Sequence, residues 1–319
     1  VGMCFPKCAH AICDLAMPQP PVVAEDPRAS RPRVLLGKVV TMTAGVVAEG
    51  AVYCRDGEIQ CVQAARDAAP PGFEQAARID TRGVIYPGMI DLHNHLEYNV
   101  QPLWRPTKTY GDRYKWRDDP RYIAEVKGVA EALRTQHSAA IIRYVEVKLL
   151  VGGVTSAQGM SLKKRGHYRG MVRNFESTGD AAYPEIEHEL NDWDRIWGKN
   201  PAEKAAKQDK VRSDAQSGKR FFHHLAEGKN QRAHDAYRAI VTERLISKNY
   251  VGIHCAGLKK EDFRDFAATG AKAAWSPLSN LLLYGQTVEV KEFLASGVEW
   301  GLGSDWSPSG TKNLLGEMK

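Results

Sequence analysis

Histidine and carboxylate residues end several apolar, strand-like runs of this 319-residue sequence. His93 and His95 form a His-Asn-His run at the end of VIYPGMIDLHNH, and residues i and i+2 of a strand point the same way, so the two imidazoles converge. His254 ends the apolar part of VGIHC, and Asp305 ends WGLGSD. Imidazole nitrogens and a carboxylate oxygen suit Zn²⁺, and also Fe²⁺ or Mn²⁺. These positions therefore predict a site for a divalent metal.

A second histidine pair, His223 and His224, closes the run RFFHH. Alternation along a strand lets one of the two face the interior, and the residues alone leave the choice open. Glu227 follows His224 by three residues, so its carboxylate lies close to the same metal. A metal lowers the pKa of bound water toward about 7, and a nearby carboxylate can take the water proton and return it to a leaving nitrogen. Glu227 is predicted to do this.

Alternating strand-like and helix-like segments must position these residues. Strand-like runs and helical patterns alternate after residue 83, most clearly in RFFHHLAEG, QRAHDAYRAIVTERLIS, YVGIHCAGL, KKEDFRDFAATG, AKAAWSPLSN, TVEVKEFLASG and VEWGLGSDW. This order predicts an α/β fold with parallel strands, and such a series closes into a TIM-like (β/α)₈ barrel. Barrels of this kind carry their chemistry at the carboxyl ends of the strands, where the candidate residues fall.

Three regions are expected along the chain. Residues 1–32 form an irregular, Pro-rich arm, 33–82 a small β-sandwich subdomain, and 83–319 the barrel domain. Asp56 and Gly57 separate two apolar runs, which is the signal of a two-residue hairpin. The residues after Asp305 number fourteen, so we expect a truncated chain in which a C-terminal return to the β layer is missing, and which is unstable or depends on association.

Composition restricts the class of partner. The net charge of +6 arises from 44 basic and 38 acidic residues that are mixed along the chain. The sequence therefore has no basic stripe of the kind that would indicate nucleic-acid binding. No apolar run reaches the roughly 18 residues that span a bilayer. Six cysteines are too few for a disulfide scaffold and favour a cytoplasmic location. We expect a small-molecule substrate as partner, and a homo-oligomer remains open.

Five motifs together resemble the amidohydrolase superfamily of metal-dependent hydrolases. They are PGMIDLHNH (87–95), HLAE (224–227), GIHC (252–255), SPLSNLLLYG (276–285) and GLGSDWSPS (301–309). Their form is most similar to the branch with chlorohydrolases, cytosine and guanine deaminases and imidazolonepropionase. The resemblance implies an enzyme that hydrolyses carbon–nitrogen bonds other than peptide bonds in a small polar substrate, by deamination or by opening a cyclic amide.

The resemblance also implies residue roles. The implied metal ligands are His93, His95, His224, His254 and Asp305. Glu227 is the implied proton shuttle, so that the catalytic residues are Glu227, His254 and Asp305. His254 either binds the metal or polarises the water or substrate oxygen, and Asp305 either binds the metal or orients the water. His223 is implied to pack outside the barrel. Ser276, Ser279 and Asn280 match a family segment but are assigned no chemistry.

One metal ion, with zinc expected first, is favoured over two. Binuclear relatives carry a carbamylated lysine on strand 4, whereas the Lys-rich stretch 198–219 is predicted to be an exposed helix. Strand 4 itself is not evident. The alternatives are a binuclear amidase, dipeptidase or lactonase, and a non-catalytic scaffold. The aromatic segment 96–123 is either a lid over the substrate or a loop packed on the barrel rim.

Overall fold

The structure is a computed structural model that describes residues 31–161, 166–168, 170–178, 183, 185–186, 188–190, 193 and 200–319. The chain divides into two compact units, Val1–Pro87 and Gly88–Lys319. All of the predicted N-terminal arm except its last two residues lies outside the described residues. The second unit begins five residues later than the boundary expected after residue 82.

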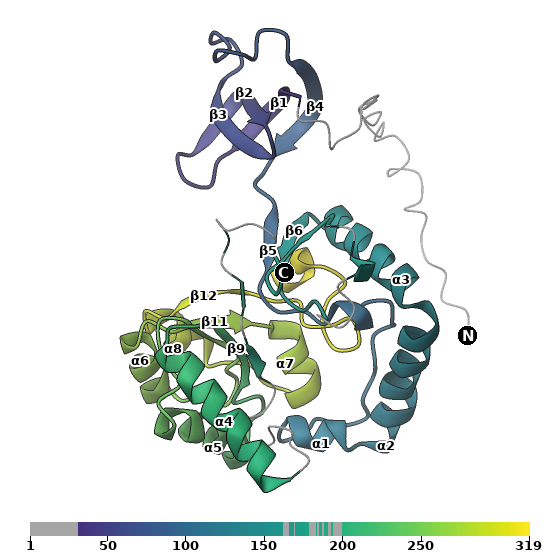
Figure 1. Cartoon of the computed structure of the whole chain (residues 1–319), viewed down its shortest axis with the longest axis vertical. Coiled ribbons are helices and arrows are strands. Elements are labelled where there is room, and N and C mark those ends of the chain that lie inside the picture. The colour runs from purple at the N-terminus through teal and green to yellow at the C-terminus, as the bar shows by residue number, and fades with distance from the viewer. Residues whose placement is uncertain are drawn as a thin grey trace, which may run out of the picture. The chain divides into compact units, whose positions relative to one another are not determined.

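The first unit is a four-stranded sheet with strand order β3-β2-β1-β4 (Figure 1). Its strands are β1 (Arg33–Val40), β2 (Val46–Arg55), β3 (Glu58–Ala64) and β4 (Ala77–Ile85). β4 pairs in parallel with β1 as far as Ile85, which is why the unit extends beyond residue 82. Its core holds Val34, Ala51, Tyr53 and Phe73.

The predicted hairpin turn joins β2 to β3. Asp56 and Gly57 have φ values of 54° and 80°, as the two central positions of this tight turn require. Arg55 faces Glu58 across the turn. The hairpin prediction is therefore confirmed.

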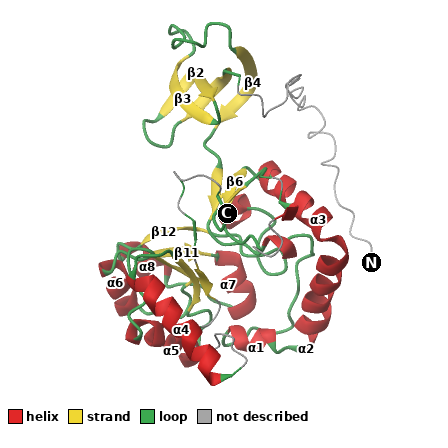
Figure 2. Ribbon diagram, in the orientation of Figure 1, coloured by secondary structure: helices red, strands yellow, loops and turns green. Residues whose placement is uncertain are grey.

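The second unit alternates strands and helices along the chain (Figure 2). Its strands are β5 (Met89–Asp91), β6 (Val154–Ala157), β7 (Arg173–Asn174), β8 (His188–Leu190), β9 (Phe221–Leu225), β10 (Tyr250–His254), β11 (Lys272–Trp275) and β12 (Glu299–Leu302). Its helices are η1 (Leu96–Tyr98), α1 (Arg113–Arg117), α2 (Pro120–Tyr122), η2 (Ile123–Lys127), α3 (Gly128–Val151), α4 (Pro201–Gln216), α5 (Gln231–Thr242), α6 (Lys260–Ala268), α7 (Pro277–Tyr284), α8 (Val290–Ala295) and α9 (Leu314–Glu317). The predicted alternation is confirmed from β9 to β12, whereas β6, β7 and β8 follow one another with no α-helix between them among the described residues.

The strands of this unit pair in parallel but do not close into one sheet within the described residues. They form a five-stranded sheet, β12-β11-β10-β9-β8, and a three-stranded sheet, β5-β6-β7. Backbone hydrogen bonds at or just beyond the strand ends connect the two sheets, among them Leu92 N to Leu302 O (3.0 Å) and Ile186 N to Phe175 O (2.8 Å). The α/β class is confirmed, whereas a closed (β/α)₈ barrel is not.

Helices α4, α5, α6 and α8 cover one face of the five-stranded sheet (Figure 1). Buried side chains on these helices pack against buried side chains of β8 to β11, and they include Val211 on α4, Tyr237 and Ile240 on α5, Phe263 and Phe266 on α6 and Phe293 on α8. Asn230 begins α5 by accepting a hydrogen bond from Ala233 N (3.1 Å). This packing fixes the strands whose ends carry the candidate residues.

Two segments differ from the sequence expectation. The strand predicted over 271–280 ends at Trp275, because Pro277 fits the first position of a helix and begins α7. The strand missing from the prediction is β8, which pairs in parallel with β9 and places Leu190 opposite His223. β8 has three residues and no apolar run, so it gives no strand signal in the sequence.

Candidate metal and active site

The ends of β5 and β12 bring the first two histidines against the aspartate. Asp305 N donates to His93 O (2.8 Å), and His95 N donates to Asp305 O (2.8 Å). The side chains follow the backbone, since His93 Nε2 lies 3.2 Å and His95 Nε2 lies 3.4 Å from Asp305 Oδ1. The convergence predicted for His93 and His95 is therefore present.

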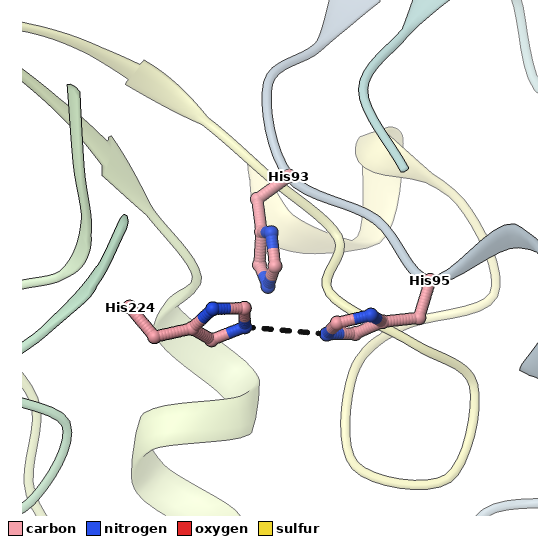
Figure 3. Close-up of side chains that lie close together, drawn as sticks. All are labelled: His93, His95 and His224. Atoms are coloured by element: carbon pink, nitrogen blue, oxygen red, sulfur yellow. Dashed lines mark hydrogen bonds between the residues drawn. The ribbon is translucent and has the colours of Figure 1, made fainter. Parts of the chain in front are cut away.

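Strand β9 places His224 beside this pair. His224 Nε2 lies 3.4 Å from His95 Nε2, and Figure 3 shows the rings of His93, His95 and His224 pointing toward one another. His223 lies on the opposite face of β9, where its Nδ1 contacts Tyr250 OH at 2.5 Å. Phe221 packs against the helices, whereas Phe222 packs on the other face of the sheet with Ile253 and Ala274. Because side chains alternate along a strand, His223 faces the helices and His224 faces the site.

Glu227 and His254 complete the group. His254 Nε2 lies 3.7 Å from Glu227 Oε2, and both side chains are buried. Three overlapping sets have ligand atoms within 4.8 Å of one another: His93, His95 and His224; His93, His254 and Asp305; His224, Glu227 and His254. All six residues singled out from the sequence for metal binding or proton transfer therefore lie together.

Three of the imidazoles are held by hydrogen bonds at Nδ1. His93 Nδ1 lies 3.0 Å from Gln158 Oε1, His224 Nδ1 lies 3.4 Å from Leu190 O, and His254 Nδ1 lies 2.9 Å from Asn280 Oδ1. Each partner is an oxygen acceptor, so each Nδ1 carries a proton and each neutral ring presents the lone pair of Nε2. This is the tautomer that binds a metal through Nε2.

The amide of Gln158 is itself oriented. Gln158 Nε2 donates to Glu176 Oε1 (3.0 Å), which turns Gln158 Oε1 toward His93. The lone pair of His93 Nε2 then faces Asp305 Oδ1 at 3.2 Å. Two such acceptors approach favourably only with a positive charge between them, either a proton or a metal ion. The donor set therefore fits a divalent cation.

Burial keeps the imidazoles neutral. Burial lowers the pKa of His95 to about 3, and it also lowers the pKa of His224 and of His254 below the ordinary histidine value. Metal binding requires neutral imidazole, so these three side chains are ready to act as ligands at neutral pH.

The carboxylates stay ionised in spite of burial. Burial raises the pKa of Glu227, but the Arg113 guanidinium, His254 and the hydrogen bond from Tyr284 together lower it by more, so the net pKa is below the usual value. Burial likewise raises the pKa of Asp305, but its contact with His93, together with the nearby His254 and His95, lowers it by more, so the net shift is downward. Both groups are anionic at neutral pH and can balance a cation.

Uncommon backbone conformations occur at the strand ends that carry the site. His254 has φ of 69° and Asp305 has φ of 58°, both in the left-handed region that non-glycine residues rarely adopt. Ala226, just before Glu227, has φ of 49°. Such conformations persist where the surrounding structure holds them, and they concentrate at functional sites.

A cavity of about 200 Å³ opens on this group. Its lining includes His95, His224, Glu227, His254 and Asp305 together with aromatic and arginine side chains of the segment 96–123. In that segment Trp116 and Tyr122 line the cavity and also pack in a buried aromatic cluster with Trp104 and Tyr110. The segment therefore packs beside the site and forms a wall of the cavity.

Several site residues escaped the sequence interpretation. Tyr284 donates a hydrogen bond to Glu227 Oε1 (2.6 Å), and Arg113 Nε lies 3.3 Å from Glu227 Oε2. Ser279 donates to Asp305 Oδ2 (2.5 Å). Ser279, Asn280 and Tyr284 lie in the segment 276–285 that resembles a family motif, and Arg113 lies in the aromatic segment 96–123, which were the available signals; nothing in the sequence pairs Gln158 with the site.

Two further observations bear on the expected chemistry. β8, which lies next to β9, has the sequence His-Glu-Leu and offers no lysine for a bridge between two metals. The Lys-rich stretch forms α4, as predicted.

Among the described helices, none combines the length and apolar character that crossing a membrane requires.

Comparisons with known proteins support the fold. No family model and no curated protein sequence matches the chain. Solved structures do: triazine hydrolase from Arthrobacter aurescens has a TM-score of 0.62 at 16% identity, and the match covers 88% of this chain and 72% of the hydrolase.

Two deaminases show the same likeness. A zinc-bound adenosine deaminase from Xanthomonas campestris has a TM-score of 0.61 at 14% identity, with 87% of this chain and 70% of the other covered. A guanine deaminase from C. acetobutylicum with bound guanine has a TM-score of 0.60 at 14% identity, with 88% and 76% covered. At these identities the comparisons show that this chain shares the fold of these amidohydrolase-type enzymes.

Proposed function

We propose that this chain is a metal-dependent hydrolase that cleaves a carbon–nitrogen bond, other than a peptide bond, in a small polar substrate. The reaction is deamination or the opening of a cyclic amide. The observation that carries the proposal is that four imidazoles, Asp305 and Glu227 form three overlapping groups whose ligand atoms lie within 4.8 Å of one another, beside a cavity that five of these residues line. The deaminases and the hydrolase with the same fold support the reaction class.

In this proposal one divalent cation binds His93, His95, His224 and Asp305, with zinc the first candidate and iron or manganese the alternatives. The zinc-bound adenosine deaminase supports zinc. When bound, the cation supplies Lewis acidity that lowers the pKa of a water toward about 7. His254 either joins the ligands or polarises the attacking water or the substrate oxygen. We further propose that the two parallel sheets are parts of one (β/α)₈ barrel, on the support of the backbone hydrogen bonds between them.

Glu227 moves the proton. As a carboxylate it accepts a proton from the attacking water, whose oxygen forms the new bond to carbon. It then gives that proton to the substrate nitrogen, which leaves with the electrons of the broken carbon–nitrogen bond. Asp305 is held by Ser279 and by the backbone of His95, so its carboxylate keeps one orientation through this sequence.

The first test replaces the shuttle. Glu227→Gln keeps the size of the side chain but cannot accept the proton, so we expect kcat to fall by about 10²- to 10⁴-fold. Zinc content, measured by mass spectrometry after reconstitution, should stay close to one equivalent per chain. Assays use guanine, adenosine, a chlorotriazine and a cyclic amide as substrates. Glu299→Gln, at an exposed position, is the matched control.

The outcomes separate the remaining alternatives. Unchanged turnover in Glu227→Gln would remove Glu227 from the mechanism. Close to two equivalents of metal would favour a binuclear hydrolase of amide, dipeptide or lactone substrates. Wild-type protein that retains no metal after reconstitution would point to a non-catalytic scaffold.

A further inference from the structure

We propose that Tyr284, oriented by Trp116, is a positioning residue that occupies Oε1 of Glu227 and thereby reserves Oε2 for the transferred proton. The inference rests on the proposed function, in which Glu227 carries that proton. It adds which oxygen does so and which residues decide it.

The direction of the hydrogen bonds follows from their chemistry. Trp116 Nε1 lies 2.8 Å from Tyr284 OH, and an indole N–H donates but never accepts. The Tyr284 oxygen therefore accepts from Trp116 and points its own proton toward Glu227 Oε1, 2.6 Å away. Because both hydrogen bonds have a fixed direction, Oε1 of Glu227 already accepts a hydrogen bond from Tyr284.

The second oxygen of Glu227 has different surroundings. Oε2 is buried and accepts no hydrogen bond from the described residues. It lies 3.3 Å from Arg113 Nε and 3.7 Å from His254 Nε2, on the side of the imidazole cluster. Oε1 is engaged by Tyr284, whereas Oε2 has no hydrogen bond from the described residues and lies on the side of the imidazole cluster, so Oε2 is the atom that takes the proton and passes it on.

Tyr284 does not transfer its own proton. Burial raises the pKa of Tyr284 well above the usual tyrosine value, and the Glu227 carboxylate raises it further. The hydroxyl therefore keeps its proton while Glu227 gains and loses one. Its part is to hold the carboxylate in one rotamer.

The hydrogen-bonded series from Trp116 through Tyr284 to Glu227 joins three segments that are distant in the sequence. Trp116 belongs to α1, Tyr284 is the last residue of α7, and Glu227 follows β9. Arg113, also in α1, donates its backbone N–H to Glu227 O (3.1 Å), which ties α1 to the same residue a second time. The aromatic segment after β5 thus positions the proposed shuttle as well as lining the cavity.

The first experiment needs no substrate. In zinc-loaded, ¹⁵N-labelled protein the indole resonance of Trp116 is identified by its absence in Trp116→Phe. We expect Tyr284→Phe to move this resonance upfield, because the acceptor is lost. Glu227→Gln should shift it as well, because loss of the carboxylate charge weakens the bond from Tyr284. Tyr237→Phe, which removes another buried hydroxyl, should leave it in place.

The second experiment measures turnover with whichever substrate of the panel the wild-type enzyme converts. Tyr284→Phe should lower kcat by about tenfold to a hundredfold, as expected for a hydrogen bond to a charged group. KM should change by less than about threefold, since the bond acts on the reacting step. In the Glu227→Gln background the same substitution should have no further effect.

The results distinguish the two levels of the argument. An unmoved Trp116 resonance in Tyr284→Phe or in Glu227→Gln would overturn the hydrogen-bonded chain, whatever the activity. A kcat loss that persists in the Glu227→Gln background would also overturn it. If the wild type turned over no substrate but both resonance shifts were present, the hydrogen bonds from Trp116 to Tyr284 and from Tyr284 to Glu227 would stand, and the result would count against the proposed function.

Discussion

At the scale of single residues, the site depends on atoms that face away from it. His93 points Nε2 toward Asp305 because Gln158 accepts from its Nδ1, and Gln158 is turned by Glu176. Partners of this kind fix the tautomer and the ring orientation of a ligand. We therefore expect the metal affinity of the site to depend also on residues that do not contact the metal.

Replacement of Gln158 tests this dependence. Gln158→Met keeps the volume but removes the acceptor, so we expect zinc to bind about 10- to 100-fold more weakly. The measurement is competition with a chromophoric chelator at pH 7.5. Gln63→Met, in the first unit, is the control, because Gln63 donates to Ala68 O and contacts no site residue. Equal affinity in Gln158→Met and wild type would show that the tautomer needs no such support.

At the scale of elements, the site depends on how closely two strand ends approach. Gly303 follows β12, and a Cβ built there would lie 2.5 Å from the Cβ and 2.7 Å from the N of His93. Both atoms belong to His93, a proposed metal ligand. They lie at or next to the backbone, so they cannot move aside as the end of a flexible side chain can. The absence of a side chain at Gly303 lets Asp305 reach the two histidines.

We expect Gly303→Ala to force the two segments apart. Overpacking of this kind costs about 1–3 kcal/mol, which urea denaturation would measure. Zinc affinity should fall in the same variant, because Asp305 moves relative to His93. Gly83→Ala serves as the control, since its added Cβ would meet Thr81 O at an ordinary 3.5 Å. Wild-type stability together with wild-type zinc affinity would contradict the argument.

At the scale of the whole molecule, the two compact units have separate cores, and the proposed metal ligands all belong to the second. A ligand that binds a folded unit stabilises that unit by mass action. All seven tryptophans also fall after residue 87, so tryptophan fluorescence reports on the second unit alone.

Metal removal should therefore affect one unfolding transition and spare the other. Zinc at about 1,000 times its dissociation constant adds about 4 kcal/mol to the unit that binds it. We expect a chelator to lower the thermal midpoint seen by tryptophan fluorescence, while a calorimetric transition of the four-stranded sheet stays in place. A single transition that shifts as a whole would show that the two units unfold together.

The sequence by itself determined the residue types of the candidate site and the order of most elements. This was possible because parallel strands present their carboxyl ends at a common edge, so that His93, His95, His254 and Asp305 had to meet once their strands were recognised. The hairpin at Asp56 and Gly57 is local and was equally evident.

Only the tertiary structure decided the rest. It placed His224, which the family resemblance had implied and the residues alone had left open, on the inner face of β9, because that face depends on which side the helices cover. It revealed β8, whose three residues form a strand by pairing with β9 rather than by any propensity of their own. It also joined Trp116, Tyr284 and Glu227, residues as much as 168 positions apart in sequence, through side-chain hydrogen bonds. Such contacts depend on the packing of whole elements, and no local pattern in the chain encodes them.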